Sequence, residues 1–180
     1  AFGHVAGNTD AGVVLSGRLE RIDGSIVSFN GGEGISLSSS SATTVSGNTV
    51  FRNGGAGVGA HPHSDGVTVT RNNVFENAGH GIASESSTIV QLTYNTVSRN
   101  GLNGINILDT PGFAQAYFFA ANVADGNGGY GIKACIVPVP GTTCAGGFVD
   151  GGGNSAQHNG SGEIQCLNIN CAKNRGQARS

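Results

Sequence analysis

Two histidines with acidic residues nearby form the strongest chemical signal in the chain. His61 and His63 lie in the segment His61-Pro62-His63-Ser64-Asp65, and His80 and Glu85 follow further along. Glu85 stands one repeat unit after His61, so stacked units would bring these two side chains within about 5 Å on an outer face. A histidine beside a carboxylate on an open groove is a workable general base. We therefore predict a catalytic group of His61, His63, His80 and Glu85.

A metal site is the competing interpretation of the same segment. Residues i and i+2 of an extended strand point the same way, as a chelating pair does, and Asp65 or Glu85 would complete the ligand set. Two exposed imidazoles on a loop are the simpler interpretation, and we favour it. Calcium requires clustered carboxylates, whereas the acidic residues here are scattered. We therefore predict neither a metal nor another cofactor.

A repeat runs along the chain and must position these side chains. Each unit is anchored by an asparagine, and successive anchors are 22, 23, 24, 23, 27 and 32 residues apart. A period in the twenties indicates one structural unit stacked many times. The anchors are Asn8, Asn30, Asn53, Asn77, Asn100, Asn127 and Asn159. Five residues after each anchor the residue is always aliphatic: Val13, Ile35, Val58, Ile82, Ile105, Ile132 and Ile164.

Other positions of the unit are equally regular. A glycine precedes every one of these aliphatic residues except Ile164, which suits a corner that needs a positive φ or a close backbone approach. A second asparagine column is expected to cap backbone groups at a corner and to bond along the stack: Asn48, Asn72, Asn95, Asn122 and Asn154. Alternating apolar positions predict two or three short strands in each unit.

A unit of this length buries its apolar residues only by lying on the next unit, at a parallel strand spacing of ~4.8 Å. We therefore predict an all-β fold, a single-stranded parallel β-helix (a solenoid) of about seven coils. Ile35, Val58, Ile82 and Ile105 should form one continuous interior file. We expect the β-helix domain to span residues 1–171 and a polar C-terminal tail to span residues 172–180.

Outward positions offer further candidates for ligand contact. Arg52, Glu76 and Arg99 each stand immediately before an anchor, so stacking would align them in a column of alternating charge. A surface ion-pair column is the simpler interpretation and would contribute little to stability. In the alternative, Arg52 and Arg99 bind substrate carboxylates. Phe118 is expected to point outward, where it either stacks on a sugar ring or packs under a neighbouring loop.

Four cysteines lie late in the chain, at Cys135, Cys144, Cys166 and Cys171. Their spacing matches no common zinc finger. We expect two local disulfides, Cys135–Cys144 and Cys166–Cys171, with a Cys135–Cys166 bond between adjacent coils as the alternative. Disulfides indicate an oxidising compartment, so the chain is expected to be extracellular, periplasmic or on the cell surface.

The composition argues against two classes of partner. A net charge of −2 gives no field for nucleic acid or anionic lipid. No run approaches the ~18 apolar residues of a membrane span. Thirty-two glycines and only 11% charged residues fit a β rod rich in corners. No signal peptide or initiator methionine is visible, so we expect the chain to be processed or excised from a longer protein.

The units resemble G-N-T-V-x-x-N-G-x-x-G-I, the repeat of right-handed parallel β-helix proteins secreted by bacteria, from about Asn8 to Cys171. That group includes carbohydrate-binding and sugar-hydrolase (CASH) domains, NosD-like periplasmic proteins, pectate lyases and mannuronan C-5 epimerases. The resemblance implies a right-handed coil, which also agrees with the general handedness of parallel connections. The resemblance is specific for the fold but indicates little about the function, because one fold of this kind hosts many activities.

The histidine segment resembles the D-P-H-D/E motif of the epimerases, in which a base removes the proton next to a sugar carboxylate. His63 matches the motif histidine, and Gly79-His80-Gly81-Ile82 matches an H-G-I turn of that family. His61 stands in place of the motif aspartate and Ser64 in place of its acid, and Ser86 lies near the position of an arginine. The resemblance implies that this face bound or processed uronate polymers.

Two functional hypotheses follow. In the first, the chain is an extracellular polysaccharide-binding β-helix domain whose partner contains uronates, and as an enzyme it would be a polysaccharide lyase or C-5 epimerase. In the second, it is a non-catalytic structural or adhesive rod that assembles end to end as a homo-oligomer. Residues 1–7 show no capping helix, and an uncovered coil invites pairing with a second copy or a preceding domain.

Overall fold

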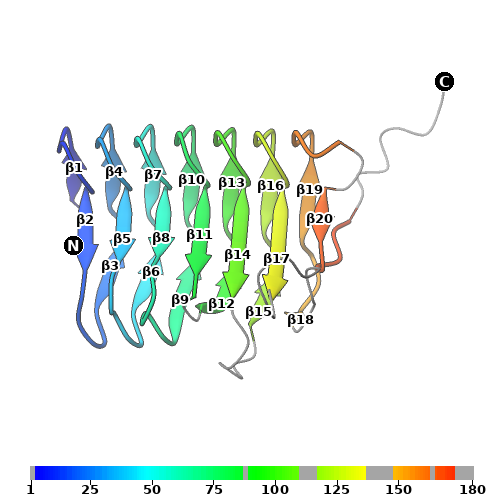
Figure 1. Ribbon diagram of the computed structural model, residues 1–180, viewed down its shortest axis with the longest axis horizontal. Coiled ribbons are helices and arrows are strands. Elements are labelled where there is room, and N and C mark those ends of the chain that lie inside the picture. Colours follow the sequence, from blue (N-terminus) through cyan, green and yellow to red (C-terminus); the bar gives the residue numbers. More distant parts are fainter. Residues whose placement is uncertain (1–2, 87–88, 110–116, 137–147, 163–164, 173–180) are drawn as a thin grey trace.

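The computed structural model describes residues 3–86, 89–109, 117–136, 148–162 and 165–172, which form a rod of stacked coils (Figure 1). Every regular element in these ranges is a β-strand. The described residues accordingly include no helix of the length and apolarity needed to cross a membrane.

The strands form three parallel sheets that run along the rod, because successive strands of a coil enter different sheets. The first sheet contains β1 (His4–Ala6), β4 (Ile26–Ser28), β7 (Thr49–Phe51), β10 (Asn73–Phe75), β13 (Thr96–Ser98), β16 (Val123–Asp125) and β19 (Ser155–Gln157). The second contains β2 (Val13–Leu15), β5 (Ile35–Leu37), β8 (Val58–Ala60), β11 (Ile82–Glu85), β14 (Ile105–Asp109), β17 (Ile132–Ile136) and β20 (Cys166–Leu167). The third contains β3 (Arg21–Asp23), β6 (Thr44–Ser46), β9 (Val67–Thr70), β12 (Ile89–Thr93), β15 (Phe118–Ala120) and β18 (Val149–Asp150).

The interior of the rod is filled by residues that share a position in the repeat. Ile35 pairs with Val58, Val58 with Ile82, and Ile82 with Ile105, and all four are fully buried. The same alternation places Val50 and Val74 inside, in register on the first sheet. The predicted continuous interior file is confirmed, and so is the parallel β-helix.

The number of coils is slightly smaller than expected. Five coils have three strands of at least three residues each. In the sixth coil the last strand, β18, has two residues, and the described part of the seventh holds only β19 and β20. The helix therefore makes about five regular turns, against the seven coils that were predicted.

The two asparagine columns form hydrogen-bonded ladders at two corners of the coil. After the first asparagine of a column, each one accepts two bonds from the asparagine one coil earlier: Oδ1 of Asn77 accepts from the backbone amide (3.1 Å) and from Nδ2 (2.9 Å) of Asn53. The residue before each anchor is left-handed, with φ of 53° at Arg52 and 55° at Glu76. Because this conformation costs a non-glycine residue about 1–2 kcal/mol, the ladders are needed to hold the corners.

The glycine that recurs before each residue of the interior file is explained by close packing and not by an unusual φ. A Cβ on Gly57 would lie 2.7 Å from the carbonyl oxygen of Gly81 and 2.8 Å from Nδ2 of Asn77. Gly57 and Gly81 are not among the residues with positive φ. Close backbone approach, and not a positive φ, therefore explains the glycine at this position.

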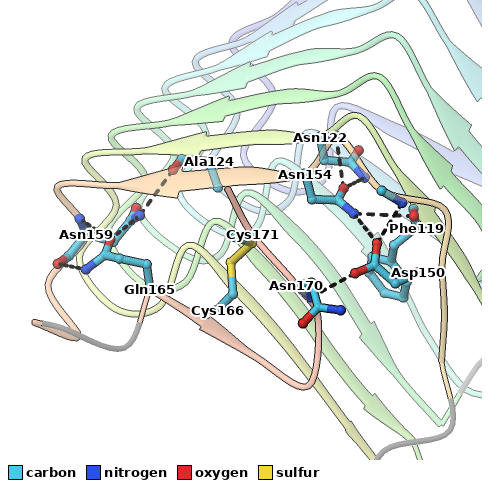
Figure 2. Close-up of a disulfide and its surroundings, with 11 residues drawn as sticks. Phe119, Asn122, Ala124, Asp150, Asn154, Asn159, Gln165, Cys166, Asn170 and Cys171 are labelled. Carbon is cyan, nitrogen blue, oxygen red and sulfur yellow. Dashed lines mark hydrogen bonds between the residues drawn. A yellow bond between two sulfur atoms is a disulfide. The ribbon is translucent and has the colours of Figure 1, made fainter. Parts of the chain in front are cut away.

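A disulfide and two capping side chains close the C-terminal end (Figure 2). Cys166 bonds Cys171, as predicted, which excludes the alternative Cys135–Cys166 bond. Cys144 lies outside the described residues, and so does the expected Cys135–Cys144 bond. Gln165 ends one ladder, because its Oε1 accepts from both the backbone amide (2.9 Å) and Nδ2 (2.8 Å) of Asn159. Oδ1 of Asp150 accepts a hydrogen bond of 3.0 Å from Nδ2 of Asn154, the last residue of the other ladder.

Candidate functional site

A shallow groove of about 210 Å³ lies on the outer face of the second sheet, over β8 and β11. Its floor consists of small residues, Ala56, Gly59, Ala60, Gly79 and Ala83. Four ionisable side chains border it: Glu33, His61, His80 and Glu85. The groove therefore brings together three of the four predicted catalytic residues, and it adds a carboxylate that the sequence reasoning missed.

Glu33 and His61 form a hydrogen-bonded pair within the groove. Oε2 of Glu33 lies 2.8 Å from Nε2 of His61, and the side chains are 22% and 44% exposed. A carboxylate at Nε2 fixes that nitrogen as the proton donor, which leaves Nδ1 as the ring nitrogen that can accept a proton. The geometry is that of an oriented general base. The partner of His61 therefore comes from the preceding coil, whereas Glu85 of the following coil was expected.

Gly59 creates the space for this pair. A Cβ at residue 59 would lie 2.6 Å from Oε2 of Glu33 and would collide with Oε1, so the carboxylate rests directly over the glycine backbone. Glu33 stands three residues after its anchor, in the same column as His80 and Asn103. This column, combined with a glycine at an outward strand position one coil later, is the sequence signal that would have found Glu33.

We expect Gly59→Ala to break the Glu33–His61 bond and leave the fold intact. The atoms in the way belong to the flexible end of one side chain, so the free energy of unfolding should change by less than about 1 kcal/mol. The nitrogen chemical shifts of the His61 ring should lose their preference for the Nε2–H tautomer. Gly3→Ala, at a position with open space, is the control, and an unchanged His61 spectrum in Gly59→Ala would contradict this account.

His80 is partly buried and already used by the fold. Its Nδ1 accepts the backbone amide of Asn103 at 3.0 Å, so its neutral form carries the proton on Nε2. Burial lowers the pKa of His80; the negative charge of Glu85 opposes this, and the positive charge of Lys133 adds to it. A neutral His80 can offer an Nε2–H donor to a ligand. Asn103 repeats this role one coil later, since its Oδ1 accepts the backbone amide of Tyr130 at 2.8 Å.

His63 lies on a turn and is not among the residues that line the groove. Strand β8 ends at Ala60, and the amide of Ser64 donates to the carbonyl of His61 at 3.1 Å. With Pro62 in second place and a φ of 68° at His63 in third, these four residues form a type II turn. The expectation that His61 and His63 project to the same side of an extended strand is wrong. Ser64, in the place of the motif acid, is buried and supports the turn by donating to the carbonyl of Leu37.

No group of three or more potential ligands that could hold a metal occurs among the described residues. Glu33 and His61 bond to each other, and Nδ1 of His80 is taken by a backbone amide. These polar groups of the groove therefore already take part in hydrogen bonds within the protein.

Arg52 and Arg99 are held by structural contacts at a corner of the coil. Nε of Arg52 lies 2.8 Å from one oxygen of Glu76, and Nη2 of Arg99 lies 3.2 Å from the other. Each guanidinium also covers a phenylalanine, Phe29 for Arg52 and Phe75 for Arg99. This is the predicted ion-pair column. Neither arginine lines the groove.

Phe118 points outward, as predicted, but it belongs to the third sheet. It is 36% exposed, while its neighbours Tyr117 and Phe119 are buried. Its ring lies over Gly151 of the next coil, where a Cβ would collide with Cζ of the phenylalanine. Sugar stacking by Phe118 would therefore occur on a different sheet from the one that carries the groove.

Comparisons with known proteins agree on the fold. The profile of a family described as "Right handed beta helix region" matches residues 4–135, which confirms the predicted handedness. No curated protein sequence matches the chain. The crystal structure of pectate lyase Pel9A aligns with a TM-score of 0.61 and 14% identity, over 87% of this chain and 52% of the lyase. A double mutant of the periplasmic alginate epimerase AlgG aligns with a TM-score of 0.49 and 19% identity, over 93% of this chain and 37% of the epimerase. The chain thus spans about half of the lyase and less than half of the epimerase.

Proposed function

Because this chain belongs to the right-handed β-helix family, we propose that it binds an uronate-containing polysaccharide in the groove of the second sheet. One observation carries the proposal: Glu33, His61, His80 and Glu85 gather around a floor of glycine and alanine on an open sheet face. Glu33 covers Gly59, but the other small floor residues allow a ring to approach the sheet closely, and the polar rim supplies donors and acceptors for hydroxyl groups.

The size of the groove favours a polymer over an enclosed small molecule. Its volume of about 210 Å³ is below the roughly 300–1,000 Å³ typical of small-molecule pockets. A polysaccharide can place one unit in such a groove and extend along the open sheet on either side. The fold similarity to a pectate lyase makes pectate the first ligand to test.

Proton abstraction from the bound uronate is the second candidate function, and the Glu33–His61 pair favours it. The pair leaves Nδ1 of His61 as a base, and His80 offers an Nε2–H donor beside it. Removal of the proton next to a uronate carboxylate is the step that a lyase and a C-5 epimerase share. His63, which the motif resemblance assigns to catalysis, lies outside the groove lining, so its participation stays a prediction.

Calorimetry with pectate and alginate oligosaccharides tests the proposal. The unmodified chain should bind one of them, and His61→Ala should weaken binding by about tenfold or more, since it removes a charge-assisted contact and exposes Glu33. His158→Ala is the control, because that exposed histidine pairs with Asp125 away from the groove. Absence of binding, or equal binding by His61→Ala, would reject the proposal.

Ultraviolet detection of unsaturated uronates and proton exchange at C5 in the same samples would separate binding from catalysis. Loss of product in His61→Ala but not in His63→Ala would assign the base to His61. The reverse result would support the assignment by motif resemblance.

The disulfide Cys166–Cys171 supports an extracellular or periplasmic location for such a domain. End-to-end assembly through the first coil stays a separate prediction. Sedimentation of the chain over a range of concentrations would test it, and a strictly monomeric particle would contradict it.

A further inference from the structure

We propose that Lys133 is the specificity residue of the groove and selects glycans that carry free carboxylates; this inference rests on the proposed function. The outward positions of the second sheet continue from the groove floor in strict register. Gly59 pairs with Ala83, Ala83 with Asn106, and Asn106 with Lys133. Lys133 therefore lies two strands beyond Ala83 on the same face, at a distance of about 10 Å.

The surroundings of Lys133 leave its charge available. It is half-buried on β17, and it is the one lysine or arginine within the described strands of the second sheet. Among the described residues it makes no ion pair within 4 Å, whereas Arg21, Arg52 and Arg99 all do. Its charge is nevertheless close enough to the groove to lower the pKa of His80.

The residue between the groove and Lys133 does not compete for this role. Asn106 is buried, and its Oδ1 accepts Nδ2 of Asn103 at 2.8 Å. The sheet face thus presents a small-residue floor bordered by Glu33 and Glu85, with the ammonium of Lys133 two strands beyond Ala83. Like charges repel, so an acidic glycan would bind with its carboxylates turned away from Glu33 and Glu85 and toward Lys133.

This charge distribution defines the ligand more closely. A bound chain would lay an uncharged part of one sugar over Ala83, next to the Glu33 carboxylate that covers Gly59, and direct a carboxylate of a neighbouring sugar to Lys133. The separation of about 10 Å requires at least a disaccharide. Methyl esterification of that carboxylate would remove the charge that Lys133 recognises.

Calorimetry with two matched ligands tests the role of Lys133: oligogalacturonates with free carboxylates and the same oligomers as methyl esters. The unmodified chain should prefer the free acid by about tenfold or more. Lys133→Gln should lose that preference, through weaker binding of the free acid and nearly unchanged binding of the ester. Arg71→Gln is the control, because it removes the same charge at a corner where the guanidinium covers Tyr94.

The outcomes separate this inference from the proposed function. If the unmodified chain binds neither oligomer, nor their alginate counterparts, the proposed function fails and Lys133 has no ligand to select. If the chain binds and Lys133→Gln keeps the full preference for the free acid, the groove stands and the role of Lys133 is rejected. A circular-dichroism melt of Lys133→Gln that matches the unmodified chain would show that the fold is retained in either case.

Discussion

Gly81→Ala should destabilise the β-helix by about 3–5 kcal/mol, the largest effect we expect from adding a single methyl group. A Cβ at residue 81 would lie 2.6 Å from the carbonyl oxygen of Gly104 and 2.8 Å from Nδ2 of Asn100, and it would collide with Val97. Two of these neighbours belong to the hydrogen-bonded frame of the next coil and cannot turn aside. A chain of this length should lose about 6–20 °C in melting temperature.

Thermal and urea unfolding, followed by circular dichroism, would measure this effect. Gly3→Ala makes the same chemical change at a position with nothing within 4 Å, and it should melt with the unmodified chain. Equal stability of Gly81→Ala and Gly3→Ala would mean that adjacent coils are not packed as closely as described.

Asn77→Ala should cost a similar amount, about 3–5 kcal/mol, through lost hydrogen bonds. The Asn77 side chain accepts two bonds from Asn53 and donates to the carbonyls of Val50 and Phe75 and to Oδ1 of Asn100. Alanine would leave the buried amide of Asn53 without its acceptor. It would also remove the contacts that hold Glu76 in its left-handed conformation.

Asn73→Ala provides the matched control for the ladder, since Asn73 is exposed on the neighbouring strand β10. It should change the free energy of unfolding by no more than about 0.5 kcal/mol. Amide hydrogen exchange should show the loss of protection in Asn77→Ala centred on the coils of Asn53, Asn77 and Asn100. A uniform small loss along the whole rod would contradict a ladder that acts between neighbouring coils.

The fold could be predicted because the repeat imposes one rule on every coil. Ile82 and Ile105 share a position in the unit, and in a parallel stack shared positions lie directly over one another. The same rule predicted the two asparagine ladders and the charge column of Arg52, Glu76 and Arg99. The number of regular turns could not be obtained in this way, because the frame marks asparagine corners and not the lengths of the strands between them.

The site was harder to predict because its contacts run diagonally across the repeat. Matching positions linked His61 to Glu85, but Glu33 reaches His61 from a different column, over the backbone of Gly59. His63 departs from the predicted orientation for a local reason: Pro62 favours the second position of a turn, and this turn ends the extended strand before His63. Lys133 carries no motif, and only the strand register connects it to the groove.

The capping of the asparagine ladders gives the rod a direction. Within each ladder, Nδ2 of one asparagine donates to Oδ1 of the asparagine one coil later. The amide dipoles of a ladder therefore point the same way and add up along the axis. The last Nδ2 of each ladder needs an oxygen acceptor at the C-terminal end, and the side chains of Gln165 and Asp150 supply it. The negative charge of Asp150 therefore faces the donor end of its row, as acidic side chains do at the amino end of an α-helix.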